Sequence, residues 1–110
     1  AQILLQWATD LGSNFVRLAH YPHNEYMVRE AEKMGLLVWS EIPVYWTVLF
    51  ENADTYINAE RQLKEMIARD KNRAAVVLWS CYVFASNVFC VVPRINSHLT
   101  ASVSFADKLP

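Results

Sequence analysis

The arrangement of short apolar runs between longer helical segments limits the possible folds of this chain more than any other feature. A mostly apolar run covers residues 14–19, fully apolar runs cover residues 36–39 and 74–79, and each has the length of a buried strand. A segment with helical periodicity precedes each run. Continuous apolar runs are typical of strands that are covered on both faces, as parallel strands are. The order α-β-α-β-α-β therefore predicts an α/β fold with parallel strands over residues 1–80.

Local signals mark the ends of the predicted helices. Gly12 and Gly35 are the only glycines, and each lies between a helical segment and a strand, where a left-handed residue is required. Asn24 can cap the second helix, and the third is expected over about residues 54–70. The predicted apolar stripes are Tyr26, Met27, Ala31 and Met34 on the second helix, and Ala59, Leu63, Met66 and Ile67 on the third. The charge pairs expected on the outer faces are Glu25 with Arg29, Glu60 with Lys64, and Glu65 with Arg69.

Composition and charge exclude several classes of partner. The net charge of −1 and the absence of a basic run argue against nucleic acid, which requires clustered Lys and Arg. Cys81 and Cys90 are the only cysteines; they give neither a disulfide framework nor metal-ligand spacing, and no motif indicates a cofactor.

Residues 74–93 carry no charge over the length of a membrane span. A span is not expected, because polar residues interrupt this run at Ser80, Ser86 and Asn87.

Three motifs in this order carry a resemblance to a known family. Residues 14–22 (NFVRLAHYP) closely resemble the second barrel strand of glycoside hydrolase family 2, which includes β-galactosidases and β-glucuronidases. Residues 36–43 (LLVWSEIP) are similar to its third strand, and residues 69–80 (RDKNRAAVVLWS) to the approach to its fourth. The resemblance implies a partial (β/α)8 TIM barrel, roughly strands 2 to 4 with their helices. A complete barrel takes about 250 residues, so less than half of one is expected here.

The resemblance also implies candidate site residues. Arg17 and His20 take the places of the family's sugar-site arginine and histidine, the arginine near the catalytic nucleophile, and Glu41 takes that of a supporting glutamate. These residues also lie at the predicted carboxyl ends of strands, which is where α/β folds have their functional sites. Trp46, in the aromatic loop after the third strand, is the best candidate for stacking on a sugar ring. Trp39, inside an apolar strand, is expected to fill the core.

The sequence departs from the family at the fourth strand, where the family has Trp-Ser, two small residues and then Asn-Glu, with the glutamate as general acid/base. Here Val83 and Phe84 occupy the Asn and Glu positions, and neither can transfer a proton. The nucleophile would come from a seventh strand that these residues do not reach. A retaining glycosidase needs both carboxylates, about 5 to 5.5 Å apart, so no catalytic residue is expected. Residues 81–110 match nothing in the family and are expected to be a frameshifted or read-through tail.

The leading hypothesis is a fragment of a retaining β-glycosidase of the β-galactoside or β-glucuronide type, inactive alone, whose partner is carbohydrate. A competing hypothesis is a non-catalytic α/β module that binds carbohydrate or a protein. A different barrel glycosidase family is a third possibility, which the His20-Tyr21-Pro22 motif argues against. Because a partial barrel has open strand edges, the fragment is expected to self-associate or aggregate. The sequence assigns no cellular compartment.

Overall fold

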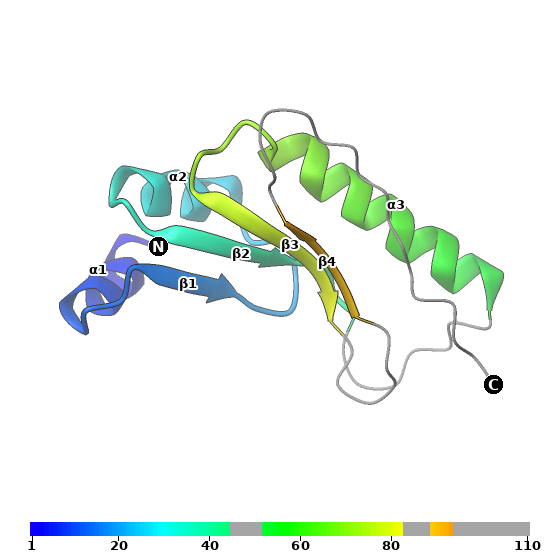
Figure 1. The fold of residues 1–110 in the computed structure, drawn as a ribbon, viewed down its shortest axis with the longest axis horizontal. Helices are drawn as coiled ribbons and strands as arrows, with labels where there is room; N and C mark the ends of the chain where they lie inside the picture. The colour runs from blue at the N-terminus through cyan, green and yellow to red at the C-terminus, as the bar shows by residue number, and fades with distance from the viewer. Residues whose placement is uncertain (45–51, 83–88, 94–110) are drawn as a thin grey trace.

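The structure, a computed structural model, describes residues 1–44, 52–82 and 89–93. Trp46, Val83 and Phe84 lie outside the described residues. The described chain alternates helices and strands, in the predicted order, as far as β3 (Figure 1). The elements are α1 (Gln2–Asp10), β1 (Phe15–Leu18), α2 (Glu25–Lys33), β2 (Leu37–Glu41), α3 (Ala53–Asp70), β3 (Val76–Tyr82) and β4 (Phe89–Pro93).

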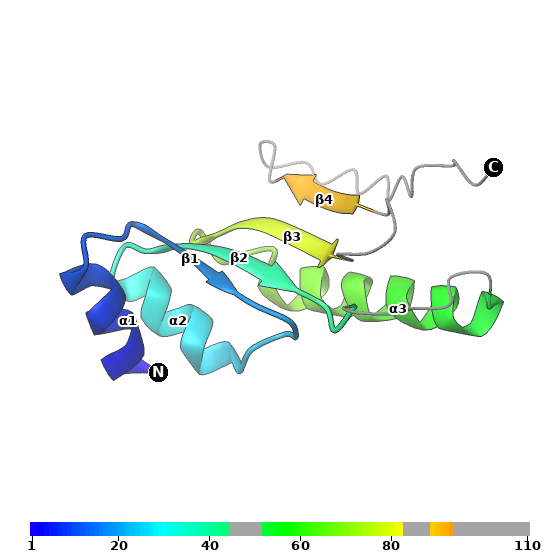
Figure 2. The same ribbon diagram turned by 90° about the horizontal axis from the view of Figure 1, so that it is seen from below.

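The strands form a single sheet in the order β1-β2-β3-β4, in which the first three are parallel and β4 is antiparallel to β3. Figure 2 shows α1, α2 and α3 on the same side of this sheet. Parallel strands that are adjacent in chain order, with every connecting helix on one face, are wound as in a barrel, because an open doubly wound sheet has helices on both faces. The predicted partial TIM barrel is confirmed.

The register of β2 against β3 shifts by one residue partway along the pair. Val38 lies opposite Val76, whereas Trp39 lies opposite Leu78, so that β3 has one extra residue at this point. Such a bulge changes the alternation of side chains along the strand. Val76 and Trp79 are therefore both buried on the helix side, although they are three positions apart.

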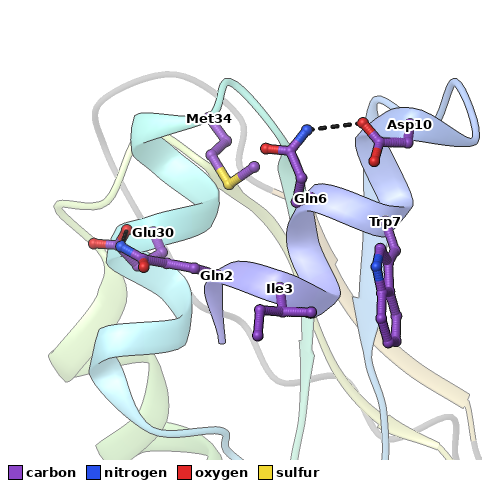
Figure 3. A pocket seen from close by; sticks show the side chains of 7 residues that line it. All are labelled: Gln2, Ile3, Gln6, Trp7, Asp10, Glu30 and Met34. Carbon is purple, nitrogen blue, oxygen red and sulfur yellow. Dashed lines mark hydrogen bonds between the residues drawn. The ribbon is translucent and has the colours of Figure 1, made fainter.

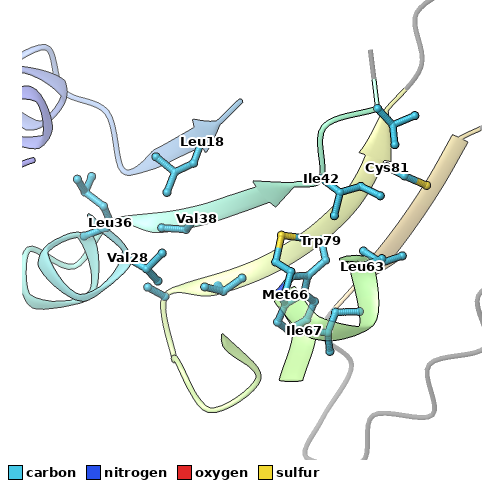
Figure 4. Close-up of a cluster of buried hydrophobic side chains, with 14 of the residues drawn as sticks. Leu18, Val28, Leu36, Val38, Ile42, Leu63, Met66, Ile67, Trp79 and Cys81 are labelled. Atoms are coloured by element: carbon cyan, nitrogen blue, oxygen red, sulfur yellow. The ribbon is translucent and has the colours of Figure 1, made fainter. Parts of the chain in front are cut away.

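The hydrophobic core lies between the sheet and the three helices (Figure 4). The predicted stripe of α3 is buried as a unit and packs near Trp79, whose indole is fully buried. On α2, Val28 and Ala31 are fully buried, while Tyr26 is 50% exposed, so its assignment to the buried stripe is wrong. A helix turns about 100° per residue, which places Tyr26 on the side opposite Val28.

The predicted helix ends are confirmed at atomic detail. The Asn24 side-chain oxygen accepts a hydrogen bond of 2.8 Å from the Tyr26 N–H, which caps α2. Gly12 and Gly35 have φ of +81° and +72°, the left-handed conformation expected at these joints. Beyond α2, the Leu36 N–H returns to the Ala31 carbonyl at 2.9 Å. These local bonds fix the angle at which each chain segment leaves its helix and enters the sheet.

Two ion pairs predicted from helical spacing form, and a third does not. Arg29 and Glu25 pair at 3.0 Å, and Lys64 pairs with Glu60 at 2.8 Å. Glu65 lies 3.5 Å from Arg61 instead of pairing with Arg69. Arg69 lies in the last turn of α3 and donates to Asp70, which is fully buried.

The sheet extends further along the chain than the apolar pattern predicts. Strand β3 continues to Tyr82, and β4 lies within residues 81–110, where no pattern indicates an element. Both strands belong to one antiparallel ladder that pairs Cys81 with Cys90. Within the described part of the chain, no helix is long and apolar enough to cross a membrane.

Candidate functional site

The carboxyl ends of β1 and β2 bring a charged pair together. Because the two strands are parallel and adjacent, side chains at their ends meet at the same edge of the sheet. The Arg17 Nε–H donates to Glu41 Oε1 at 2.5 Å. The Glu41 side chain is 2% exposed, and that of Arg17 is 34% exposed. The pair therefore consists of a buried carboxylate and a guanidinium that reaches solvent.

His20 joins this pair through its backbone. Its N–H donates to Glu41 Oε2 at 3.1 Å, and its ring Nδ1 lies 3.9 Å from the same oxygen. The two Glu41 oxygens thus hold different partners, one the Arg17 side chain and the other the His20 main chain. The imidazole is 59% exposed, so it faces solvent beside the guanidinium. The three residues predicted from the motifs are brought together in one cluster, here called the strand-end cluster.

The backbone at His20 adopts an unfavourable conformation to make these contacts. Its φ is +79°, the left-handed region, and among the described residues it is the only non-glycine with positive φ. Such a conformation costs about 1 to 2 kcal/mol for a residue with a side chain. Strain of this kind persists where surrounding contacts impose it, and it is concentrated at functional sites.

Trp39 and Ser80 also contribute to the strand-end cluster, and sequence reasoning missed both. The Arg17 Cζ lies 4.8 Å from the centre of the Trp39 ring, a cation–π contact. The Trp39 Nε1–H donates to Ser80 Oγ at 2.6 Å. The expectation that Trp39 fills the core is wrong, because the helix-side core of β2 is formed by its neighbour Val38 and side chains alternate between the two faces. Trp39 lies opposite Arg17 in the β1–β2 pairing, so knowledge of that pairing would have placed Trp39 on the same face as Arg17.

Tyr21, near the end of the second-strand motif, and His23, just beyond it, shape the loop that follows β1. The rings of Tyr21 and His23 stack with centroids 4.7 Å apart and planes 6° apart. His23 Nε2 is 3.2 Å from the Ala19 carbonyl oxygen. His23 therefore acts as a loop residue, and the stack supports the turn that holds His20.

A hollow lies in the helical layer, between α1 and α2 (Figure 3). The polar side chains that line it bond to one another: Gln2 on α1 donates to Glu30 Oε2 on α2 at 2.9 Å, and Gln6 donates to Asp10 at 2.8 Å. It lies on the helix side of the sheet and shares no residue with the strand-end cluster. Within the described ranges, no group of three or more His, Cys, Asp or Glu residues could hold a metal ion.

The chemistry of the strand-end cluster suits a polar, oxygen-rich ligand. Its solvent side presents a guanidinium, which only donates hydrogen bonds, and an imidazole, which can donate or accept. The exposed rim therefore matches hydroxyl or carboxylate oxygens. A strand-end cluster on consecutive parallel strands with their helices on one face is the arrangement of a TIM-barrel enzyme domain.

The family is shown by comparison with known proteins. The model of the glycosyl hydrolases family 2 TIM barrel domain matches residues 3–86, and the chain belongs to this family. A β-glucuronidase from Sus scrofa is 39% identical over 82 residues, which are 70% of this chain and 12% of the relative. A β-galactosidase from Thermoanaerobacterium thermosulfurigenes is 37% identical over 70 residues, or 64% of this chain and 10% of the relative.

Solved structures give the same result. The apo structure of Bacteroides uniformis β-glucuronidase 3 matches with a TM-score of 0.63 and 37% identity, covering 70% of this chain and 10% of that one. Bifidobacterium dentium β-glucuronidase, solved with coumarin-3-O-glucuronide, matches with a TM-score of 0.65 and 28% identity, covering 71% of this chain and 13% of that one. The chain spans 8% to 14% of the length of the first curated relatives that it matches.

Proposed function

We propose that residues 1–80 form part of the sugar-binding face of a retaining β-glycosidase barrel, of the β-glucuronide or β-galactoside type. Arg17 and His20 contact the sugar, and Glu41 holds both of them in place. The observation that carries this proposal is the buried Glu41 carboxylate, which engages the two residues through separate oxygens. The names of the relatives, β-glucuronidase and β-galactosidase, support a carbohydrate ligand.

We further propose that the 110-residue polypeptide has no hydrolytic activity by itself. Counted from Trp79-Ser80, Val83 and Phe84 take the positions of the family's Asn-Glu pair. The family match extends to residue 86, which supports counting the motif this far. Valine and phenylalanine cannot protonate a leaving group. Double displacement requires a proton donor and a nucleophile on opposite sides of the bond, so one absent carboxylate is enough to stop it.

The test is an assay of the purified chain on p-nitrophenyl β-D-glucuronide and p-nitrophenyl β-D-galactoside. No release of nitrophenol above that of a mock preparation is expected. Turnover that a free sugar inhibits and that Glu41→Gln abolishes would refute the proposal of inactivity. Sugar binding is tested separately by titrating each sugar into the chain and into Arg17→Lys, with Arg61→Lys on the exposed face of α3 as the matched control. Loss of binding in the first variant only supports the proposed site, and equal binding by both variants contradicts it.

A non-catalytic module that binds carbohydrate is the second candidate. The strand-end cluster supports it, because Arg17 and His20 stay assembled on Glu41, while the proposed acid/base position carries Phe84. Such a module must fold as a stable unit. A sharp cooperative melt of the isolated chain, together with saturable sugar binding and no turnover, would favour it over an inactive fragment.

We also propose that the isolated chain self-associates. Strand β1 is an edge of the described sheet, and α1 exposes a stripe of apolar residues next to it. This stripe consists of Ile3, Leu4, Trp7 and Leu11. An open edge and an uncovered apolar surface both favour contact with further chains. Sedimentation velocity should show species larger than a monomer at micromolar concentration, and replacement of Leu4 and Leu11 by Gln should reduce them; a monomer in both cases would exclude self-association.

A further inference from the structure

We propose that Trp39 and Ser80 are positioning residues of the strand-end cluster, and that Trp39 sets the orientation of the Arg17 guanidinium. This inference rests on the proposed function, because it gives Arg17 a fixed orientation toward the sugar. The two residues act through Arg17 and do not contact the reacting atoms themselves. They extend the cluster from two strands to three, since Ser80 belongs to β3.

The first step concerns how the Arg17 guanidinium is held. Its Nε–H donates a hydrogen bond to Glu41 Oε1. A planar cation is held in a more defined orientation when a ring face also supports it, and Arg stacks on aromatic faces more readily than Lys does. The Trp39 ring, 4.8 Å from Cζ, supplies such a face.

The second step concerns what fixes the ring. The Trp39 Nε1–H donates to Ser80 Oγ at 2.6 Å, and Ser80 is fully buried. A buried hydroxyl cannot exchange this partner for bulk water without cost. Ser80 therefore prevents the indole from turning away from Arg17.

The third step is the register of the sheet. Arg17 and Trp39 are directly paired in the β1–β2 ladder. On the other side, the register shift between β2 and β3 places Ser80 opposite Glu41, diagonal to Trp39. Diagonal neighbours on one face are within reach of a long aromatic side chain. The line from Arg17 through Trp39 to Ser80 thus crosses three adjacent strands on the face away from the helices.

The experiment measures how fast phenylglyoxal modifies each arginine of the chain, followed by peptide mass spectrometry. Arg69 is the internal reference, because its side chain is 32% exposed, close to the 34% of Arg17, and it also pairs with a buried carboxylate. In Trp39→Leu the rate at Arg17 should rise about tenfold, the loss expected for a well-formed cation–π contact. In Ser80→Ala the rise should be about threefold, since the ring remains but is not anchored. The rate at Arg69 should not change.

The controls separate positioning from folding. Trp39→Phe keeps an aromatic face but cannot donate to Ser80, so its Arg17 rate should rise about threefold, as in Ser80→Ala. Ser80→Thr keeps the acceptor and should stay near the wild-type rate. Trp7→Leu makes the same change as Trp39→Leu on α1, away from the strand-end cluster. An unchanged Arg17 rate in both Trp39→Leu and Ser80→Ala overturns the proposal. An equal rise at Arg69 in both variants also overturns it, because the effect is then general unfolding. A wild-type Arg17 that reacts as fast as it does in urea overturns it as well.

A second arm distinguishes this inference from the proposed function. The same rates are measured with saturating p-nitrophenyl β-D-glucuronide or the β-D-galactoside. Protection of Arg17, but not of Arg69, supports a sugar site. If neither sugar protects Arg17 but Trp39→Leu still accelerates its modification, the proposed function fails while the positioning role stands. If a sugar protects Arg17 and the Trp39 and Ser80 variants have no effect, the positioning role fails alone.

Discussion

The two ends of the sheet contain the same unusual backbone conformation, but different residues adopt it. At the amino end, where α1 and α2 lead into strands, left-handed positions are filled by Gly12 and Gly35. At the carboxyl end, after β1, the left-handed position is filled by His20. Glycine adopts this conformation without strain, and histidine does not. The amino end is therefore built for stability, while the carboxyl end retains strain that positions a side chain and a backbone N–H.

The two pairs of arginine with a buried carboxylate show a similar contrast. Arg69 makes two hydrogen bonds to its neighbour Asp70 and a third, of 3.0 Å, to the His23 carbonyl, so it links α3 to the loop before α2. The hydrogen bonds with Asp70 raise the pKa of Arg69. Arg17 donates to Glu41, a residue of the neighbouring strand, and lies against the Trp39 ring. Arg69, with Asp70 and His23, joins α3 to the loop before α2, whereas the Arg17–Glu41 pair holds a guanidinium that reaches solvent.

The largest expected effect comes from breaking the Arg69–Asp70 pair. Asp70→Ala should lower the free energy of unfolding by about 3 kcal/mol, because it removes one partner of a buried ion pair and frees the link to His23. Glu41→Gln should cost only about 1 kcal/mol, since an amide oxygen can still accept one of the two hydrogen bonds and the Arg17 guanidinium already reaches solvent. Urea unfolding followed by circular dichroism measures both values. Equal losses in the two variants would remove the contrast between the pairs.

A left-handed position filled by glycine and the one filled by histidine should respond to substitution in opposite directions. Gly35→Ala should lower the free energy of unfolding by about 1 kcal/mol, a purely conformational cost because an added Cβ meets no atom within 4 Å. His20→Gly should raise it by about 0.5 kcal/mol, since relief of strain outweighs the entropy of glycine and the N–H bond to Glu41 survives. Thermal melts of both variants beside the wild type provide the comparison. A destabilised His20→Gly would mean that the imidazole contributes to folding.

The smallest effect is a dependence of α2 docking on pH. The hydrogen bond from Arg73, and then the charge of Arg29, lower the pKa of Glu25 below its ordinary value of 4.5. A lowered folded-state pKa stabilises the fold above pH 4.5, and this stabilisation is lost as the pH falls through the folded-state value. The difference in Tm between the wild type and Glu25→Gln should therefore be constant above about pH 5.5 and shrink below pH 4.5. A difference that grows on acidification would show that the pair does not act in this way.

Much of the fold could be predicted from the sequence because its local signals agree with one another. The glycine joints, the Asn24 cap and the stripe of α3 each depend on nearby residues only, and all three are confirmed. Predictions fail where distant contacts decide. Arg69 pairs with Asp70 and His23 instead of Glu65, because Asp70 is buried and a loop from the first half of the chain lies within reach.

The strand-end cluster shows the same division. The motifs name Arg17, His20 and Glu41, and parallel pairing brings them together, while their roles toward a sugar stay predictions. Trp39 is assigned to the core from the sequence because every residue of its run from Leu36 onward is apolar, so alternation between faces cannot be seen in it. The face that Trp39 occupies depends on register, which the sequence of one strand does not contain.

The extra residue in β3 has a consequence for how this segment tolerates insertions and deletions. Because the bulge absorbs one position between Val76 and Trp79, a shorter strand lacking Val77 would pair without a bulge and still direct the Trp79 indole toward the helices. An insertion between Trp79 and Ser80 has no such reserve: it would exchange the faces of Ser80 and Cys81, turning the thiol toward Arg17 and the hydroxyl toward the hydrophobic core. A one-residue change in the length of β3 is thus tolerated before Trp79 and disruptive after it.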